Sequence, residues 1–187
     1  MMKRWALILV IFISACSNQP EKTYYQLPVV AIAPQNSAVI QHDHQLWVQR
    51  IILSDYLASS GVVYQSSDVS YVSAVNHLWA GPLEQQLQQV LVAELTMALP
   101  QRLVSAQPLV SKPETLDVII TGFHGRYDGK VILQGYWTLT RQGRVVKWPF
   151  NLELKQEEDG YDDLVRTLAK GWSQLAQAIA SQLASQT

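Results

Sequence analysis

Three consecutive stretches in the C-terminal half constrain the fold of this chain more than any other feature. Residues 116–126, 131–141 and 145–155 are rich in β-branched and aromatic side chains, and the tight turns Asp128-Gly129 and Gln142-Gly143 separate them. An Asp-Gly pair in this position is a strong signal for a two-residue hairpin of type I′, in which both turn residues have positive φ. The sequence therefore predicts three long antiparallel strands joined by hairpins.

The last of these stretches has one apolar and one polar face. Its apolar side chains are Val146, Trp148, Phe150, Leu152 and Leu154, and its polar ones are Lys147, Asn151, Glu153 and Lys155. Such alternation is typical of a strand with one face in water. Pro149 has no N–H to give to a ladder, so we expect this strand to lie at a sheet edge or to carry a bulge.

Two amphipathic helices are predicted around this unit. The first has Pro82 at its first helical position and ends at Pro100; the second covers residues 161–185, with Asp162 and Asp163 in a first turn where the helix dipole favours negative charge. The apolar stripe of the first helix consists of Leu83, Leu87, Val90, Leu91, Leu95 and Ala98, and Gln85, Gln86, Gln88 and Gln89 lie on the rest of its surface. The apolar stripe of the second helix consists of Leu164, Leu168, Trp172, Leu175, Ile179 and Leu183. The first stripe has the width expected for packing on a sheet, and a partner-binding helix is the alternative.

Further strands are predicted before the first helix. The expected strands are residues 24–30, 46–53, 62–65 and 69–75, the last two forming a hairpin, and residues 31–44 are an expected loop. Residues 46–53 are apolar on both predicted faces, which indicates a central strand covered on both sides. Strands and helices together in a chain of this length indicate an α/β domain.

Composition limits the class of protein. The chain has 187 residues, 48% hydrophobic and 16% charged, with a formal net charge of −1. This length fits one globular domain, and the apolar content excludes a disordered chain. The near-neutral charge argues against a nucleic-acid partner, because phosphate contacts need a basic surface. A single cysteine excludes an intramolecular disulfide and a cysteine-rich zinc site.

The N-terminus is typical of an exported lipoprotein. Lys3 and Arg4 precede an apolar run, residues 5–13, that is too short to span a bilayer but has the length of a signal-peptide core. The Ile-Ser-Ala-Cys sequence ending at Cys16 then resembles the lipobox of bacterial lipoproteins. We expect a signal peptide over 1–15, a lipidated tether over 16–23 and one domain over 24–187. Cys16 would carry N-palmitoyl and S-diacylglycerol groups; the alternative is an ordinary buried thiol.

The mature chain is expected to be held at a membrane by lipid alone. Cleavage before Cys16 removes Lys3 and Arg4, which reduces the 14 basic residues to 12 against 15 acidic ones and gives a net charge of −3. Such a chain gains no adhesion to anionic headgroups, whereas each buried acyl CH₂ contributes about 0.8 kcal/mol. Ser17 is not the aspartate that commonly retains lipoproteins in the inner membrane, so the resemblance implies the outer membrane, with the domain facing the periplasm.

Common motifs for catalysis are absent from the sequence. The chain has no G-x-x-x-x-G-K-[ST], G-x-G-x-x-G, H-E-x-x-H or G-x-S-x-G motif. His42-Asp43-His44 could be a metal cluster, but solvated loop residues are the simpler interpretation. The acidic run Glu157, Glu158, Asp159, Asp162 and Asp163 could bind calcium, but helix capping explains part of it.

One histidine lies within a predicted strand. His124 is expected on one face with Val118 and Ile120, and we interpret it as a partly buried histidine rather than a catalytic base. No cofactor and no metal are predicted. An enzyme whose catalytic residues are dispersed in the sequence is the alternative.

Several segments together resemble one family. They are the lipobox ending at Cys16, YYQLP at 24–28, DYL at 55–57, GVVY at 61–64, LWAGPL at 78–83, FHGRYDGKV at 123–131 and DGYD at 159–162. Their order and spacing are similar to the auxiliary lipoproteins of ABC-type and MCE-type lipid transport systems. Gly81 stands where that family often has glutamate or serine.

The resemblance implies a fold, partners and a role. The fold would be a three-layer α/β sandwich with a mixed β-sheet and two main helices, similar to the TolB N-terminal and anticodon-binding domains. The partners would be a PqiB-like MCE protein that bridges the periplasm and a PqiA-like inner-membrane protein. A homo-oligomer is a further expectation, because ring-forming partners favour symmetric mates.

The implied role is that of a non-catalytic docking subunit in lipid transport that supports envelope integrity. Two alternatives from other classes stay open. One is an outer-membrane activator of peptidoglycan synthases, and the other is a periplasmic lipid-binding carrier.

Overall fold

The computed structural model describes residues 21–28 and 44–185, which form a mixed sheet, two α-helices and a short 3-10 helix. The strands are β1 (Thr23–Tyr25), β2 (Gln45–Leu53), β3 (Gly61–Gln65), β4 (Tyr71–Trp79), β5 (Leu103–Ser105), β6 (Glu114–Arg126), β7 (Lys130–Arg141) and β8 (Arg144–Lys155). The helices are η1 (Asp55–Leu57), α1 (Leu83–Ala98) and α2 (Tyr161–Ala184).

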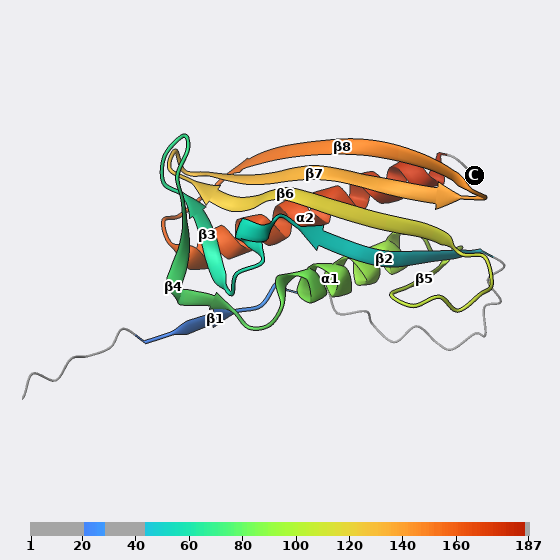
Figure 1. Ribbon diagram of the computed structural model, residues 1–187, viewed down its shortest axis with the longest axis horizontal. Coiled ribbons are helices and arrows are strands. Elements are labelled where there is room, and N and C mark those ends of the chain that lie inside the picture. The colour runs from blue at the N-terminus through green and yellow to red at the C-terminus, as the bar shows by residue number, and fades with distance from the viewer. Residues whose placement is uncertain (1–20, 29–43, 186–187) are drawn as a thin grey trace, which may run out of the picture.

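The sheet is organised around β6. On one side β6 pairs antiparallel with β7, which pairs with β8. On the other side it pairs in parallel with two strands in turn, with β2 along residues 114–120 and with β3 at residues 125 and 126. β5 extends the sheet beyond β2, and β4 and β1 extend it beyond β3. Figure 1 shows the long strands running the length of the molecule.

Both α-helices cover the same face of this sheet. The indole N–H of Trp172 in α2 donates to the carbonyl oxygen of Leu87 in α1 over 3.1 Å, so the helices lie side by side. The α/β class, the mixed sheet and the two main helices are confirmed, but the described residues form two layers rather than the expected three. The reason is that β6, β7 and β8 are joined by tight hairpins, which deliver no crossover helix to the second face.

The apolar stripe predicted for α2 forms much of the core. All six of its residues are buried, and Trp172 meets the Phe123 ring of β6 edge-on with 6.3 Å between centroids. Gly171 allows the close approach, because a Cβ there would lie 2.7 Å from a methyl carbon of Leu133. Burial of each large apolar side chain stabilises the fold by roughly 1.5–3 kcal/mol, which is why the helix and sheet form together.

A β-bulge decides which face of β2 is buried. Val48 pairs with Leu116 and Arg50 with Asp117, so Gln49 is an extra residue between them. The extra residue shifts the alternation of side chains by one. The buried apolar side chains on the two sides of the bulge therefore share one face, and they are Leu46, Val48, Ile51 and Leu53. The prediction of a strand covered on both faces is wrong for this reason.

A second bulge, at Thr121 in β6, moves His124 to the face away from the helices. Before the bulge, Val118 and Ile120 are buried in the core. After it the alternation is shifted, so that Gly125 faces α2 and His124 faces the other way. The expectation that His124 shares a face with Val118 and Ile120 is therefore wrong.

The two long hairpins are confirmed, but their turn types are not both as predicted. Between β6 and β7 only Gly129 has positive φ, at 77°, and its N–H donates to the Arg126 carbonyl oxygen over 3.0 Å. This three-residue loop matches a type I turn with a G1 bulge. Between β7 and β8, Gln142 and Gly143 have φ of 50° and 78°, as a type I′ turn requires.

The other predicted elements differ mainly at their ends. α1 begins at Leu83, so Pro82 is its N-cap rather than its first helical residue. The β3–β4 hairpin and the edge position of β8 are confirmed, and β8 pairs with β7 without a bulge. β1 covers only part of the strand predicted over 24–30. Residues 29–43 lie outside the described residues, so the rest of that strand and nearly all of the loop over 31–44 stay predictions.

Candidate functional site

The described chain begins at the end of the molecule where the predicted lipid tether would attach. β1 follows that tether directly, and Figure 1 shows it reaching this end beside β4. Cys16, the predicted attachment residue, lies outside the described residues and stays a prediction. Four side chains hold the residues that follow the tether, and we call them the clasp: Tyr25, His77, Tyr161 and Asp162.

Backbone pairing makes the first connection between β1 and the sheet. Thr23 lies opposite His77 and Tyr25 opposite Trp79 in parallel register. The Ala80 N–H also donates to the Tyr25 carbonyl oxygen over 2.7 Å. A net backbone hydrogen bond contributes only about 1 kcal/mol, so a three-residue strand needs additional contacts to stay in place.

The clasp supplies these contacts from three elements. The Tyr25 hydroxyl of β1 donates to Asp162 Oδ1 of α2 over 2.9 Å and lies 3.1 Å from Nδ1 of His77 in β4. Because its proton is used on Asp162, the phenolic oxygen accepts from His77, which carries a proton on Nδ1. The His77 ring stacks on Tyr161 of α2 with 3.9 Å between centroids. One connected group thus joins β1, β4 and α2.

The Tyr25 hydroxyl keeps its proton at neutral pH and so remains a hydrogen-bond donor in this group. Partial burial and the hydrogen bond to Asp162 raise the pKa of Tyr25 to about 12. Sequence reasoning missed the clasp, because Tyr25 and Asp162 are separated by 137 positions and no local pattern pairs them. The only available signal was that both residues fall in segments of the family pattern.

A buried amide ties the same segment to α1. Gln86 Oε1 accepts from the Leu27 N–H over 2.9 Å, and its Nε2 donates to the Gly81 carbonyl oxygen over 3.1 Å. Leu27 itself is buried in the core. The assignment of Gln86 to the polar side of the helix is wrong, because the chain after β1 crosses α1 here and needs a polar partner for its backbone.

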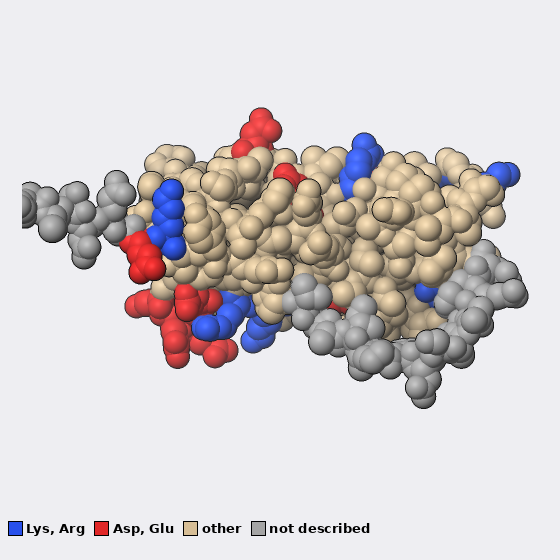
Figure 2. All heavy atoms as spheres, turned by 90° about the horizontal axis from the view of Figure 1, so that it is seen from below, with Lys and Arg blue, Asp and Glu red and all other residues tan. Residues whose placement is uncertain are grey.

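Acidic side chains gather at this end of the molecule. Figure 2 shows Asp and Glu atoms concentrated there with Lys and Arg atoms beside them, while most of the rest of that face is uncharged. Asp163 Oδ2 accepts from the N–H groups of Glu157 and Glu158 over 3.0 and 3.2 Å, so it holds the loop that precedes α2. The N-cap of α2 is Gly160, with no side-chain cap bond, so the prediction that helix capping explains part of the acidic run is wrong.

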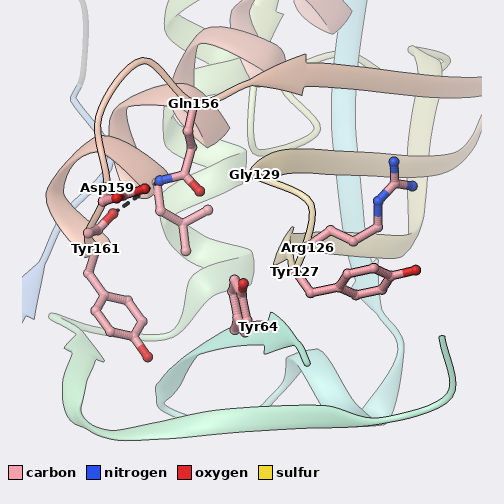
Figure 3. A pocket seen from close by; sticks show the side chains of 9 residues that line it. Tyr64, Arg126, Tyr127, Gly129, Gln156, Asp159 and Tyr161 are labelled. Carbon is pink, nitrogen blue, oxygen red and sulfur yellow. Dashed lines mark hydrogen bonds between the residues drawn. The ribbon is translucent and has the colours of Figure 1, made fainter. Parts of the chain in front are cut away.

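A cavity of about 320 Å³ opens beside the clasp (Figure 3). Tyr64 of β3, Tyr161 of α2 and the loop from Gln156 to Asp159 surround it. Gln156 extends into this space, while Arg126 and Tyr127 extend together toward one side. The residues lining the cavity include no serine, cysteine, histidine or lysine, so they offer no nucleophile with a paired base.

Arg126 at the rim of this cavity is engaged within the protein. Its Nε donates to Asp128 Oδ1 over 2.9 Å, and its Nη2 donates to Glu153 Oε2 over 3.2 Å. Lys130 Nζ donates to the same Glu153 oxygen over 3.0 Å. These hydrogen bonds lower the pKa of both carboxyl groups and raise that of Arg126. The network ties the β6–β7 turn to β8.

A second charged group lies where α1 ends and β6 begins. Arg102 Nη1 donates to Glu114 Oε2 over 2.7 Å, and Arg141 Nε lies 2.6 Å from Glu114 Oε1. A cavity of about 510 Å³ adjoins this group, with Leu99 and Pro100 in its wall. The ion pairs connect the chain after α1 with β6 and β7, which is a structural role.

The interpretation of His124 as a buried histidine is confirmed. The Tyr56 hydroxyl donates to the Thr121 carbonyl oxygen over 2.8 Å and lies 3.4 Å from His124 Nδ1. Tyr71 of β4 covers the imidazole edge-on, with 5.1 Å between centroids. Burial, followed by the charge of Arg126, lowers the pKa of His124 to about 4, so the ring is neutral at pH 7.

The remaining candidate ligands are not brought together in the part of the chain that the structure describes. No group of three or more His, Cys, Asp or Glu side chains placed to hold a metal ion occurs within residues 21–28 and 44–185. His44 is exposed, and its predicted partners His42 and Asp43 fall outside these ranges. Over the same ranges, neither α1 nor α2 nor any other helix combines the length and apolarity needed to cross a bilayer.

Comparison with known proteins gives the class. Residues 25–180 match the family described as ABC-type transport auxiliary lipoprotein component, and the chain belongs to this family. The chain is similar to the intermembrane transport lipoprotein PqiC of Escherichia coli (strain K12), with 50% identity over 184 residues, 97% of this chain and 98% of the relative. The protein of the same name from Shigella flexneri matches with the same values.

Two crystal structures have the same fold. One, of an uncharacterized protein, is 50% identical and superposes with a TM-score of 0.79, covering 87% of this chain and 99% of that one. The other, of a protein from Xanthomonas campestris, gives a TM-score of 0.68 at 17% identity, covering 88% of this chain and all of that one. The second likeness shows the fold alone.

Proposed function

We propose that this protein is an outer-membrane lipoprotein that faces the periplasm and acts as a non-catalytic docking subunit of an intermembrane lipid transport pathway. Cys16 carries the acyl chains, and the α/β domain meets the end of a PqiB-like MCE protein that works with a PqiA-like inner-membrane protein. The pathway supports envelope integrity. Membership of the auxiliary lipoprotein family and 50% identity to PqiC lipoproteins support the accessory role.

The clasp is the observation that carries this proposal. A docking subunit on a lipid anchor must transmit force from its tether to its body without losing its first strand. Tyr25 is bonded to α2 and β4 only nine residues after Cys16, and Leu27 is bonded to α1. Force applied through a lipid anchor before β1 is therefore transmitted to the whole core and not to β1 alone.

Removal of the lipid attachment residue tests the anchor. In Cys16→Ala the domain is expected to fold with the same thermal midpoint but to leave the outer-membrane fraction and to lose complementation of an envelope defect. Mass spectrometry of the native protein is expected to find Cys16 as the N-terminal residue with its acyl groups. An unmodified thiol with the leader still attached, or full complementation by the variant at the outer membrane, contradicts the proposal.

Copurification tests the partners. After crosslinking in the periplasm, the MCE protein is expected to be recovered with the tagged lipoprotein, and Ser17→Thr serves as a matched control with an unchanged anchor. Recovery of a peptidoglycan synthase without an MCE protein would instead favour the activator hypothesis. A stoichiometric phospholipid in native mass spectra of the delipidated domain would favour the carrier hypothesis.

A further inference from the structure

Aromatic rings form much of the wall of the cavity beside the clasp. Tyr64, Tyr127 and Tyr161 come from β3, from the β6–β7 turn and from α2, and Figure 3 shows Tyr64 between the other two. Leu164 of α2 also lines the cavity and is buried. With a volume of about 320 Å³, the cavity falls in the range of small-ligand sites, roughly 300–1,000 Å³.

Two of these rings are held in place by the surrounding fold. The Tyr64 ring and Leu164 both rest on Gly125, because a Cβ there would lie 2.9 Å from Cδ2 of Tyr64 and 3.0 Å from Cδ1 of Leu164. The Tyr161 ring stacks on His77 with 3.9 Å between centroids. A ligand that contacts these rings therefore spends little free energy on ordering the wall.

The polar groups of the loop before α2 offer acceptors to the cavity. Gln156 Nε2 donates to the carbonyl oxygens of Glu158 and Gly160, each over 3.2 Å, which leaves the side-chain oxygen of Gln156 to accept. Gln156 extends into the cavity in Figure 3. Asp159 also lines it, and the Asp159 carboxylate forms no ion pair with any residue that the structure describes.

The positive groups at the cavity are already neutralised by the protein. Arg126 lines the cavity, but all three of its guanidinium nitrogens donate to the carboxylates of Asp128 and Glu153. The N-terminus of α2 also lies here, and Asp162 and Asp163 in its first turn offset the positive end of the helix dipole. A phosphate or carboxylate ligand needs donors that are not already used, so the wall favours a cation over an anion.

The residue types in the wall distinguish an organic cation from a metal ion. A calcium or magnesium ion requires several oxygen ligands around it, and Asp159 is the one carboxylate in the lining. Tyrosine rings instead attract ammonium groups through their electron-rich faces, and aromatic cages are a common means of binding methylated ammonium. Two fixed rings beside one carboxylate therefore fit an organic ammonium group better than a metal ion.

We propose that this cavity binds an organic ammonium group, primary or methylated, which lies against the rings of Tyr64 and Tyr161 and pairs with Asp159. A phospholipid headgroup is the source that fits its place, because the cavity opens at the end of the domain where the predicted tether would attach. The assignment to a lipid rests on the proposed function, whereas the ammonium site rests on the cavity alone. A free amine is the other source of the same chemistry.

Titration of the full-length lipoprotein with choline chloride tests the site. The protein is held in neutral maltoside micelles, and the amide NMR signals of Gly129 and Gly160, which line the cavity, report its occupancy. Saturable shifts are expected with choline, but not with sodium chloride or inorganic phosphate at the same ionic strength. Tyr64→Leu removes a ring and Asp159→Asn removes the charge, and each is expected to raise the dissociation constant for choline about fivefold.

Two control variants separate the site from its surroundings. Tyr64→Phe keeps the ring and is expected to bind choline as the parent does. Glu158→Gln removes a carboxylate from the same loop, but Glu158 does not line the cavity, so its affinity for choline should also be unchanged. If Tyr64→Leu lowers the thermal midpoint strongly, Asp159→Asn decides the result, because Asp159 is exposed and its substitution leaves the core intact.

Lipid nanodiscs distinguish the two sources of the ammonium group. Shifts of the same two amide signals in nanodiscs that contain phosphatidylethanolamine, but not in nanodiscs of phosphatidylglycerol alone, support the lipid headgroup. A response to choline without a response to phosphatidylethanolamine supports the ammonium site and contradicts the lipid source.

The outcomes separate this proposal from the proposed function. Shifts with phosphate and not with choline, an equal response to sodium chloride, or an affinity for choline that is unchanged in both Tyr64→Leu and Asp159→Asn overturns the ammonium site. A copurified MCE protein without a response to choline supports the proposed function and overturns the site. A response to choline in a lipoprotein that recovers no MCE protein gives the reverse result.

Discussion

Among the residues that the structure describes, β4 and β8 both have one edge without a partner strand, but the two strands differ in sequence. β8 has twelve residues, a proline whose nitrogen faces the open edge, and charged side chains on its wetted face. The open part of β4 has no proline and no charge, and its apolar side chains are exposed. Its ladder with β3 instead shifts register between the pairs Val63–Ser73 and Gly61–Leu78, and such an irregularity interrupts the edge. The difference teaches that one sheet can limit unwanted pairing at its two edges by different means, through proline and charge in β8 and through an interrupted ladder in β4.

The two edges also differ in what supports them. β8 is fixed along its whole length by β7, including the stack of Trp148 on Trp137 with 4.1 Å between centroids. β4 is fixed by the β3 hairpin, by β1 and by two aromatic groups, one around His77 on the face of the helices and one around His124 on the other. The stability of the β4 side of the sheet therefore depends more on the contacts of individual side chains than the stability of the β8 side does.

The largest effect on stability is expected from Gly135→Ala, because this substitution disrupts β7, the strand that pairs with β8. A Cβ at this position would lie 2.0 Å from the Ile119 carbonyl oxygen, and a backbone atom cannot move aside as a side chain can. We expect a loss of about 3 kcal/mol in the free energy of unfolding. Chemical denaturation measures it, with Gly125→Ala beside β3 as the control, where the added Cβ meets only side chains of Tyr64 and Leu164. Equal losses in both variants would contradict this reasoning.

Acid is expected to weaken the β4 side next. The folded pKa of His124 is about 4, below the ordinary value near 6.5, so between these pH values the unfolded chain binds a proton that the folded chain does not. Stability should therefore fall as pH falls from 6.5 to 4, by up to about 3 kcal/mol. Urea unfolding at pH 4.5 and 7 measures the change. In His124→Phe this part of the pH dependence should disappear; if it persists, other groups cause it.

A smaller effect is expected from opening the clasp. Tyr25→Phe removes the hydroxyl between Asp162 and His77 and should cost about 1 kcal/mol, with faster amide hydrogen exchange in β1 than in β7. Tyr24→Phe is the matched control, because its ring is 62% exposed. An equal increase of exchange in both variants would show that the hydroxyl of Tyr25 does not hold the strand.

The smallest change in stability is expected from Pro149→Val, which removes the protection of β8. The fold should lose or gain less than about 1 kcal/mol, because the outward nitrogen takes no part in the β7–β8 ladder. Self-association should instead increase, and sedimentation velocity over a range of concentrations measures it. If Pro149→Val remains as monodisperse as the parent, proline is not what protects this edge.

Much of the fold could be predicted from short-range patterns. The stripe from Leu164 to Leu183, the hairpins around β7 and the edge position of β8 follow from helical spacing, turn residues and a proline, all of which act within a few residues. The predicted site residue Cys16 belongs to the same class of local signal and awaits its chemical test. The clasp could not be predicted, since Tyr25, His77 and Asp162 meet only after β1 and β4 pair beside α2.

The sequence by itself determined the strand and helix segments, because backbone preference and side-chain period are properties of neighbouring residues. The tertiary structure alone decided which face each strand buries, where the bulges at Gln49 and Thr121 fall, and which edge stays open beside β1. A bulge depends on the register with a partner strand, and an open edge depends on which strands do not arrive. Neither the position of a bulge nor the presence of an open edge can be predicted from the residues of one strand alone.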